Sequence, residues 1–567
     1  MSRLVLTGVL AVGLIGLSQT GCAATAQTSS DSVLPPKSET LPAMLTDATT
    51  YLPDFSYAGY RNGGPTPQRF DGTVFDVTDY GAIADDGLDD TQAVFRANAA
   101  AHAHEGAVIL RFPEGRFILS DILYIERSDF ALQGAGDGDQ IGATTLYFPY
   151  PMQTLDTPDA FTELSEYLIE FDKRQREKEN NIDMPFSLYA WSGGFIWAQP
   201  PNHRGKAYLE RYDDAPDPLT AVTGGERESR AIEVADASGL SVGQVYKLEW
   251  YNRRGEFGPL LDAIYGDRAR FKKLGGHHWN FPNRALVTQS MRVESINGNR
   301  VTLSSPLMFD ADPAFEPTLV PWSALENVHI GNFNVDFPNG IRMPHHVEDG
   351  FNALYLLGLY DSTVQSVTIT NSDAGIMTDD IGNVTIRDIH TRGDHRAHYT
   401  VHMGSVHNVL ADALTIDNVA QHPISFNTYA VRSVYRDVDL NAGVLLDQHS
   451  GANHQNLFDD IRVSIALDTD QDRIKLFDGG GAGYWKPSHG RYSTFHNIRV
   501  TVTGADNVDV PITLSGPQDG VEVRLLHVYG NREFAIDYGP DPVIQGLNQG
   551  SPIPSLYDWQ RAARGTK

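Results

Sequence analysis

The chain has 567 residues, 41% of them hydrophobic, so it is long and apolar enough to bury a large core. Its formal net charge of −28 excludes the basic face that nucleic acids require. Its only cysteine, Cys22, excludes a disulfide within the chain, and no apolar run after the N-terminus is long enough to span a bilayer. Stability must therefore come from packing.

The N-terminus has the layout of an export signal, with a short apolar segment over residues 4–17. Cys22 follows Gln19-Thr20-Gly21, and the first 22 residues resemble a bacterial lipoprotein signal peptide. The resemblance implies lipidation of Cys22 and anchoring to the outer membrane or cell surface. Cleavage after Ala24-Thr25-Ala26 is the alternative and predicts a periplasmic or secreted protein. Residues 23–70 are predicted to be a flexible tether.

Residues 71–147 are predicted to form an N-terminal cap and the first coils of a repeat. Asp89, Asp90 and Thr91 offer side-chain oxygens to the free amides at the start of a short helix. Strands are expected after this helix, beginning with residues 108–118.

Residues 148–318 interrupt the repeat and are predicted to be an insertion. Its charged segment 160–182 favours a helix, and a small β module is expected over residues 230–306, with strands at Ile232–Val234, Val245–Trp250 and Arg300–Ser305. The insertion also carries six large aromatic residues: Tyr189, Trp191, Trp197, Trp250, Tyr251 and Trp279. They form either the wall of a glycan cleft or the insertion's own core, and the core is favoured for any single tryptophan.

Residues 319–540 carry a recurring pattern, an apolar pair two residues apart and another apolar residue three positions on. Val364-Gln-Ser-Val-Thr-Ile369 is an example, and the steps from Val364 to Val384, Val409, Val434 and Leu457 are 20, 25, 25 and 23 residues. Such a period, without helical stripes, predicts an all-β solenoid with one coil per repeat. A β-sandwich is the alternative. Residues 541–567 are predicted to be a C-terminal tail.

Three motifs near the N-terminus resemble the opening of the pectate-lyase superfamily. They are Asp79-Tyr80-Gly81-Ala82, Asp86-Gly87-Leu88-Asp89-Asp90-Thr91 and Phe112-Pro113-Glu114-Gly115. The resemblance implies a right-handed parallel β-helix whose end is covered by a helix. It leaves the function open, because polysaccharide lyases, polygalacturonase-type hydrolases, epimerases and phage tailspikes share this fold.

In a solenoid, outward side chains of successive coils stack about 4.8 Å apart, so polar residues at equivalent positions form one groove. The polar residues just before each apolar pair are Asn352 and Tyr355, Asp379 and Asp380, Tyr399 and His402, Ser425 and Asn427, Asp447 and His449, and Arg473 and Lys475. Eight of the 19 histidines also lie between His390 and His454. Histidine titrates near neutrality and suits proton transfer, so we expect the active site here.

Two reactions on a polysaccharide compete for this groove. A lyase needs a base, an acid and a group that neutralises the uronate carboxylate. The residues assigned to catalysis are His402, Tyr399, Arg396, Asp379, Asp380, His449 and Asp447, with His402 and Tyr399 as base and acid. Substrate binding is assigned to Asn352, His398, Asn427, His454, Arg473 and Lys475, with Arg396, Asn427 or Lys475 as the neutralising group.

An inverting hydrolase instead needs two carboxyl groups about 6.5–9.5 Å apart, for which Asp379, Asp380 and Asp447 are candidates. Thr378-Asp379-Asp380, followed by His402, partly resembles polygalacturonase-type hydrolases. That family's Gly-His-Gly is replaced here by Val401-His402-Met403, so the lyase ranks first. A non-catalytic glycan-binding adhesin is the third alternative.

Calcium held by Asp379, Asp380 or Asp447 is the expected metal if there is one, because carboxylates on adjacent strands can converge. Zinc is less favoured, since the histidines lack a compact spacing such as His-Glu-x-x-His. The expected partner is a polysaccharide. Contact with a membrane is expected only through a lipid anchor, and the chain is expected to be a monomer.

Overall fold

The structure is a computed structural model that describes residues 51–136, 143–158, 161–162, 164–165, 186–201, 216–270, 279–281, 283–449, 451–468, 471–481, 486–504, 510–539 and 543–565. The predicted signal peptide with Cys22, and most of the predicted helix at 160–182, lie outside these residues. Within the part of the chain that is described, no helix is both long enough and apolar enough to cross a membrane.

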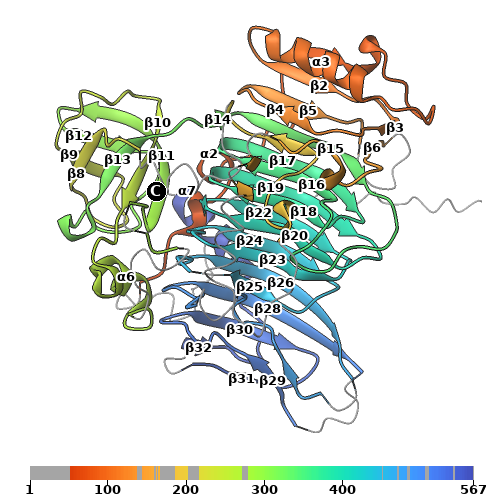
Figure 1. Ribbon diagram of the computed structural model, residues 1–567. Coiled ribbons are helices and arrows are strands. Elements are labelled where there is room, and N and C mark those ends of the chain that lie inside the picture. Colours follow the sequence, from red (N-terminus) through yellow and green to blue (C-terminus); the bar gives the residue numbers. More distant parts are fainter. Residues whose placement is uncertain are drawn as a thin grey trace, which may run out of the picture.

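Most strands belong to two long parallel sheets that run along the molecule (Figure 1). The larger sheet has 16 strands, and its main path runs β1 (Thr73–Asp76), β2 (Val108–Arg111), β5 (Phe130–Gln133), β15 (Val328–Asp336), β17 (Leu359–Thr370), β19 (Ile381–Arg392), β22 (Leu410–Ile416), β24 (Val434–Leu440), β26 (Leu457–Ala466), β28 (Thr494–Thr503), β30 (Arg524–Gly530) and β32 (Val543–Gln545). Its shorter strands are β3 (Gly115–Ile118), β6 (Thr144–Tyr147), β14 (Leu325–Glu326) and β21 (Val406–His407).

The second sheet has seven strands in the order β25 (Leu446–His449), β23 (Ala420–Asn427), β20 (Ala397–Gly404), β18 (Ala374–Asp379), β16 (Asn352–Leu357), β7 (Ile196–Ala198) and β4 (Leu123–Ile125). A third parallel sheet contains β27 (Arg473–Ile474), β29 (Ile512–Ser515) and β31 (Phe534–Asp537). From β15 to β26 the chain visits the two long sheets alternately, and crossovers between parallel strands are right-handed. The predicted right-handed parallel β-helix is confirmed.

Apolar residues at one position stack from coil to coil and fill the core. Ile330 lies opposite Val364, and Val364 lies opposite Ile386. The column continues through Ala411, Tyr435, Phe458, Phe495 and Leu525. All of these side chains are buried. Each coil thus buries its apolar edge against its neighbours, which explains the period of the sequence repeat.

Helix α3 (Thr91–Ala103) covers the end of the solenoid beside β1 and β2, as predicted (Figure 1). The carboxylate of Asp89 accepts a hydrogen bond from the first N–H of the helix. Asp90 departs from the prediction, because its carboxylate accepts hydrogen bonds from the N–H groups of Ile83 and Ile118 instead. It ties the start of the helix to the first coil.

The predicted β module is a closed antiparallel barrel that stands beside the solenoid (Figure 1). Its strands are β8 (Thr220–Gly224), β9 (Ala231–Val234), β10 (Val245–Trp250), β11 (Val287–Asn297), β12 (Arg300–Leu303) and β13 (Thr318–Pro321). Helix α6 (Pro259–Tyr265) joins β10 to β11. The predicted bounds of the insertion were wrong, because β7 lies within residues 148–318 and yet is a strand of the second sheet.

Both terminal segments pack against the solenoid, which corrects two predictions. Residues 51–70 of the predicted tether contain buried Phe55 and Ala58, the 3-10 helix η1 (Phe55–Tyr57) and the short helix α2 (Tyr60–Gly63). The predicted tail contains β32 and helix α7 (Leu556–Gly565). Apolar residues of both segments share one buried cluster with the coils: Phe55, Ala58, Leu410, Val434, Leu457, Ile553, Leu556 and Tyr557. The remaining short helices in the described part of the chain are η2 (Val77–Tyr80), η3 (Met152–Thr154), η5 (Leu188–Ala190), η6 (Gly255–Phe257) and η7 (Pro313–Phe315).

Candidate active site

A group of aromatic side chains gathers on the second sheet, where β20, β23 and β25 lie next to one another. We name it the histidine cluster, and its members are His345, His346, His398, Tyr399, His402, His422 and His449. Ring contacts join all seven, with centroids 4.1 Å apart for His398 and Tyr399 and 4.4 Å apart for His422 and His449. His345 and His346 come from the loop between β15 and β16, and the His345 ring lies 4.2 Å from that of His398.

The strand register explains why residues distant in sequence meet here. Tyr399 of β20 lies opposite His422 of β23. His402 lies opposite Ser425, and Ser425 lies opposite Asp447 of β25. In the next row, Asn427 lies opposite His449. The predicted stacking therefore agrees with the register for Ser425 with Asp447 and for Asn427 with His449, whereas Tyr399 and His402 lie opposite His422 and Ser425.

Asp447 is fully buried and lies at one end of the cluster, beside His422 and His449. Its Oδ2 atom lies 2.8 Å from Nδ1 of His422 and 3.1 Å from Nδ1 of His449, and it accepts a hydrogen bond from Ser425 Oγ. Its Oδ1 atom accepts the backbone N–H of Gly480 at 2.7 Å. A Cβ atom at residue 480 would lie 2.3 Å from the His449 ring, so only glycine fits there.

Glu348 occupies the corresponding place at the other end of the cluster. Its Oε1 atom lies 3.0 Å from Nδ1 of His398 and 3.4 Å from Nδ1 of His345, and it accepts the backbone N–H of His346. Two buried carboxylates therefore face four imidazoles of the cluster: Asp447 faces His422 and His449, and Glu348 faces His345 and His398.

Burial and these carboxylates set the protonation of the cluster. Burial lowers the pKa of His398 and of His422 below that of free histidine, and burial together with His345 lowers the pKa of His346 to about 3. Burial and the charge of Asp447 raise the pKa of Tyr399 well above its usual value. His346, His398 and His422 are therefore neutral at neutral pH, beside the protonated phenol of Tyr399.

The pKa values of the two carboxylates, Asp447 and Glu348, shift in the direction that favours the charged form. Burial alone would raise the pKa of Asp447, but His449 and His422 hold it well below its usual range. His345 and His398 likewise hold the pKa of Glu348 below its usual range despite burial. Both carboxylates are therefore ionised at neutral pH and orient the imidazoles beside them.

The edge of the cluster is partly open to solvent. The side chain of His345 is 34% exposed and that of His449 is 14% exposed, whereas Tyr399 is fully buried. Asn427 is partly exposed and its Nδ2 donates a hydrogen bond to the Tyr399 hydroxyl at 3.2 Å. Arg396 is exposed, and its charge acts on His422. A substrate would therefore meet His449, Asn427 and Arg396 before it met the predicted base and acid.

Two overlapping groups in the cluster have the composition of a metal site. His345, His398 and His422 each offer one ligand atom, and these atoms lie within 4.8 Å of one another. His422, Asp447 and His449 form the second group. Among the described residues, no such group includes Asp379 or Asp380, whereas Asp447, the third aspartate predicted for calcium, belongs to the second group.

Several predicted site residues lie elsewhere. Asp380 pairs with Lys247 of the barrel, and Asp379 is the buried last residue of β18. His454 is buried beside Phe309, at the junction with the barrel.

Three other predicted substrate-binding residues also have different roles. Asn352 is fully buried and its Nδ2 donates to the backbone carbonyl of Tyr189, so it supports the fold. Arg473 is exposed and forms an ion pair with Asp537 in the third sheet, and Lys475 is exposed beyond the same strand. By contrast, the predicted residues in the cluster or at its edge are Arg396, His398, Tyr399, His402, Asn427, Asp447 and His449.

The aromatic residues of the predicted insertion mostly fill cores. Trp197, Trp250 and Trp279 are fully buried, and Tyr189 and Tyr251 are nearly so. Trp191 is the exception: it is partly exposed, and its ring lies 5.3 Å from His346 and 6.2 Å from His398. Trp191 therefore borders the cluster, as does Phe186, whose ring lies 4.9 Å from His346, and for Trp191 the glycan-cleft wall stays a prediction.

Sequence reasoning missed His345, His346, Glu348 and His422. The first three lie in one short segment, Pro344-His345-His346-Val347-Glu348, whose paired histidines beside a glutamate were a usable signal. That segment lies outside any strand, so the repeat could not place it. His422 lies just before Pro423 and three residues before Ser425, outside the polar positions that the repeat marks in that coil.

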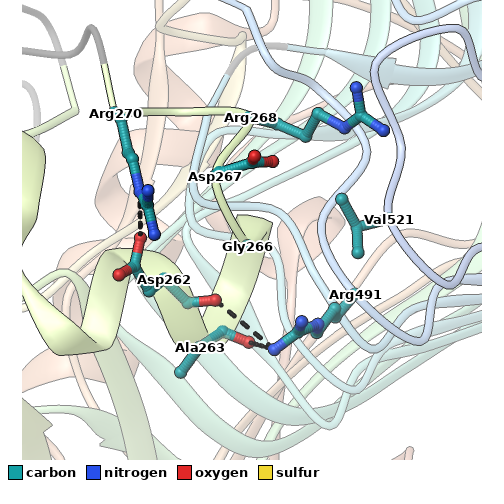
Figure 2. A pocket seen from close by; sticks show the side chains of 8 residues that line it. All are labelled: Asp262, Ala263, Gly266, Asp267, Arg268, Arg270, Arg491 and Val521. Atoms are coloured by element: carbon teal, nitrogen blue, oxygen red, sulfur yellow. Dashed lines mark hydrogen bonds and ion pairs between the residues drawn. The ribbon is translucent and has the colours of Figure 1, made fainter.

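A separate hollow of about 580 Å³ lies beside α6 (Figure 2). It is lined by Asp262, Ala263, Gly266, Asp267, Arg268, Arg270, Arg491 and Val521. Arg270 pairs with Asp262, and Arg491 donates to the backbone carbonyl of Ala263. It shares no residue with the histidine cluster.

No protein family model and no curated protein matches the chain. Solved structures with a similar chain path include the tailspike gp61 of Pseudomonas phage phi297, with 12% identity, a TM-score of 0.43, and coverage of 85% of this chain and 76% of that one. The A-module of Azotobacter vinelandii mannuronan C-5 epimerase AlgE4 has 11% identity and a TM-score of 0.34, covering 84% and 97%. A family 28 exopolygalacturonase of Yersinia enterocolitica has 12% identity and a TM-score of 0.29, covering 85% and 80%. These likenesses concern the fold.

Proposed function

We propose that the protein is an exported polysaccharide lyase that cleaves a uronate-containing chain by β-elimination at the histidine cluster. The observation that carries the proposal is the pairing of buried Asp447 with His449, whose ring reaches the solvent-facing edge. A carboxylate at Nδ1 fixes the ring and leaves Nε2 as a proton acceptor. The export signal predicted from the N-terminus fits a substrate outside the cell.

In this reaction His449 removes the proton from the carbon next to the uronate carboxylate. The electron pair forms a carbon–carbon double bond, the bond to the glycosidic oxygen breaks, and the departing oxygen takes a proton from water. The exposed guanidinium of Arg396 neutralises the uronate carboxylate, which makes the proton more acidic. Asn427 hydrogen-bonds the sugar, and buried Tyr399 positions Asn427.

This assignment changes the roles expected from the sequence. His402 and Tyr399 were the preferred base and acid, but His402 is 5% exposed and Tyr399 is fully buried. The inverting hydrolase also fits less well, since it needs a carboxyl pair flanking the substrate. Asp380 is engaged by Lys247, and Asp447 is fully buried among histidines.

The test measures two products on a panel of uronate polysaccharides: ultraviolet absorbance of the unsaturated uronate, and new reducing ends. We expect both to rise together with the wild-type protein. His449→Ala should lower kcat about 100-fold or more because it removes the base. Arg396→Ala should raise KM and lower kcat.

His390→Ala is the matched control, because His390 also pairs with an aspartate, Asp417, but on the exposed surface outside the cluster. Its activity should match that of the wild type. Reducing ends without absorbance would replace the lyase with the hydrolase. Saccharide binding with neither product would support an adhesin and refute the lyase.

A further inference from the structure

We propose that His345, His398 and His422 bind one divalent transition-metal ion of the zinc class. The site has three imidazole ligands and a fourth position open to solvent beside His345. This inference goes beyond the polysaccharide reaction and does not depend on it, because it concerns the affinity of the cluster for an ion.

The first argument is geometric. One ligand atom of each imidazole lies within 4.8 Å of the other two. Zinc binds imidazole nitrogens at about 2.0 Å in tetrahedral geometry, which sets the nitrogens about 3.3 Å apart. Small side-chain rotations are enough to close that difference. The three residues come from a loop, β20 and β23, so the site joins segments that are separate in sequence.

The second argument is that the cluster has unsatisfied buried atoms. His398 is 3% exposed, His422 is 5% exposed and Glu348 is 5% exposed. The Nδ1 atoms of all three imidazoles lack a hydrogen-bond partner of acceptable geometry, although each lies within 3.4 Å of a carboxylate oxygen. Glu348 Oε2 is also buried without a partner. An ion bound at the Nε2 atoms would keep the ring proton on Nδ1, so that each Nδ1–H could donate to the carboxylate oxygen beside it and end its lack of a partner.

The third argument is chemical. Imidazole is a preferred ligand of zinc, copper, nickel and iron, whereas calcium takes oxygen ligands, so the donor set selects transition metals. Metal-bound histidines usually have a carboxylate beside their other nitrogen, which holds the ring in place. Asp447 stands beside His422, and Glu348 stands beside both His345 and His398. The carboxylates thus supply the outer support of a metal site.

The exposure of the His345 side chain leaves a fourth coordination position of the ion open to solvent. The His345 side chain is 34% exposed, so the ion would meet solvent on this side. Sites with three protein ligands and an open position bind water or a substrate oxygen at the fourth.

The experiment uses the purified mature protein after treatment with a chelator and dialysis. Titration with Co²⁺ should produce the visible absorbance of a tetrahedral complex that saturates at one equivalent, and Zn²⁺ should displace it. His345→Gln, His398→Gln and His422→Gln should each abolish that signal. His390→Gln should keep it, since this histidine lies outside the cluster.

His449→Gln distinguishes the two overlapping groups. We expect it to retain one equivalent of Co²⁺. If His449→Gln loses the ion while His345→Gln retains it, the ion sits at the group with Asp447 and the proposal is wrong. Absence of stoichiometric binding by the wild-type protein also overturns it.

A second readout covers variants that fold poorly. Zn²⁺ should raise the Tm of the wild-type protein and leave that of His345→Gln unchanged, and His345 is the most exposed of the three ligands. An equal rise in both proteins would contradict the site.

Discussion

Among single residues, Asp447 connects several parts of the candidate site. One fully buried carboxylate faces the imidazoles of His422 and His449, the hydroxyl of Ser425 and the backbone N–H of Gly480. An amide at this position cannot accept from all four, because one of its two ends is a donor. The charge of Asp447 and its acceptor geometry therefore act together.

We predict that Asp447→Asn lowers kcat for the polysaccharide substrate about 100-fold or more, because the base His449 loses its orientation. Unfolding free energy should fall by about 1–3 kcal/mol, since a buried donor then faces another donor. Kinetics and chemical denaturation measure the two effects.

Asp417→Asn is the control, because it alters an aspartate–histidine pair whose side chains are 40% and 34% exposed. It should leave both quantities nearly unchanged. An Asp447→Asn protein with full activity would remove the aspartate–histidine pair from the mechanism.

At the scale of elements, one left-handed corner recurs in eight successive strands of the larger sheet. The corner residues have positive φ and are Asn332, Ser366, Asp388, Ala413, Asp437, Asp460, Asn497 and His527. Each one is skipped in the pairing between neighbouring strands, as Ser366 is between Gln365 and Val367. The chain bends there, and so the apolar residues on either side are three positions apart in the sequence repeat. Asn and Asp suit this corner because they tolerate the left-handed conformation.

Asp460 is a corner residue whose contribution to the free energy of unfolding depends on pH. Burial raises the pKa of its carboxyl to about 6, above that of an aspartate in the unfolded chain. Between pH 4 and 6 the folded protein therefore binds more protons than the unfolded one, so this contribution to stability is lost as pH rises through 6.

We predict that Asp460→Asn raises the unfolding free energy at pH 8 by about 1 kcal/mol, a value reduced for the partial exposure of the side chain. It should have little effect at pH 4. The amide oxygen can still accept the hydrogen bond that Asn497 donates. Denaturant unfolding at the two pH values measures the difference.

Asp388→Asn is the matched variant, because Asp388 occupies the same corner with a φ of 55° but is exposed. It should show no comparable dependence on pH. Equal gains for Asp460→Asn at pH 4 and pH 8 would mean that conformation, and not ionisation, is responsible.

At the scale of the whole molecule, a buried ion pair fastens the barrel to the solenoid. Lys247 of β10 pairs with Asp380, which follows β18, and their side chains are 3% and 12% exposed. Trp322 donates its Nε1–H to the same carboxylate at 3.0 Å, and the ammonium group lies 4.4 Å from the centre of its ring. The sequence predicts Asp380 to be part of a catalytic groove, and instead its ion pair joins the barrel to the solenoid.

We predict that Lys247→Met lowers the unfolding free energy by about 3–5 kcal/mol, because it leaves a buried carboxylate without its lysine. The double variant Lys247→Met with Asp380→Asn should recover most of that loss. Lys475→Met, which changes an exposed lysine, is the control and should be neutral. Thermal unfolding followed by fluorescence gives the comparison, and a double variant no better than Lys247→Met would refute the coupling.

The sequence by itself determined the solenoid, its capping helix and three strands of the barrel, because apolar periodicity reports which side chains face a core. The sequence also predicted that three pairs of polar residues lie in adjacent coils: Tyr399 and His402, Ser425 and Asn427, and Asp447 and His449. The repeat length shows which residues are one coil apart.

The tertiary structure alone decided which side chains complete the candidate site. The loop that carries His345 and Glu348 has no period, so its contact with His398 depends on how the chain folds back over the sheet. Docking of the barrel likewise decided the place of Asp380, and the packing of both terminal segments replaced a predicted tether and tail. These contacts join residues far apart in the chain, and no local pattern encodes which surfaces will meet.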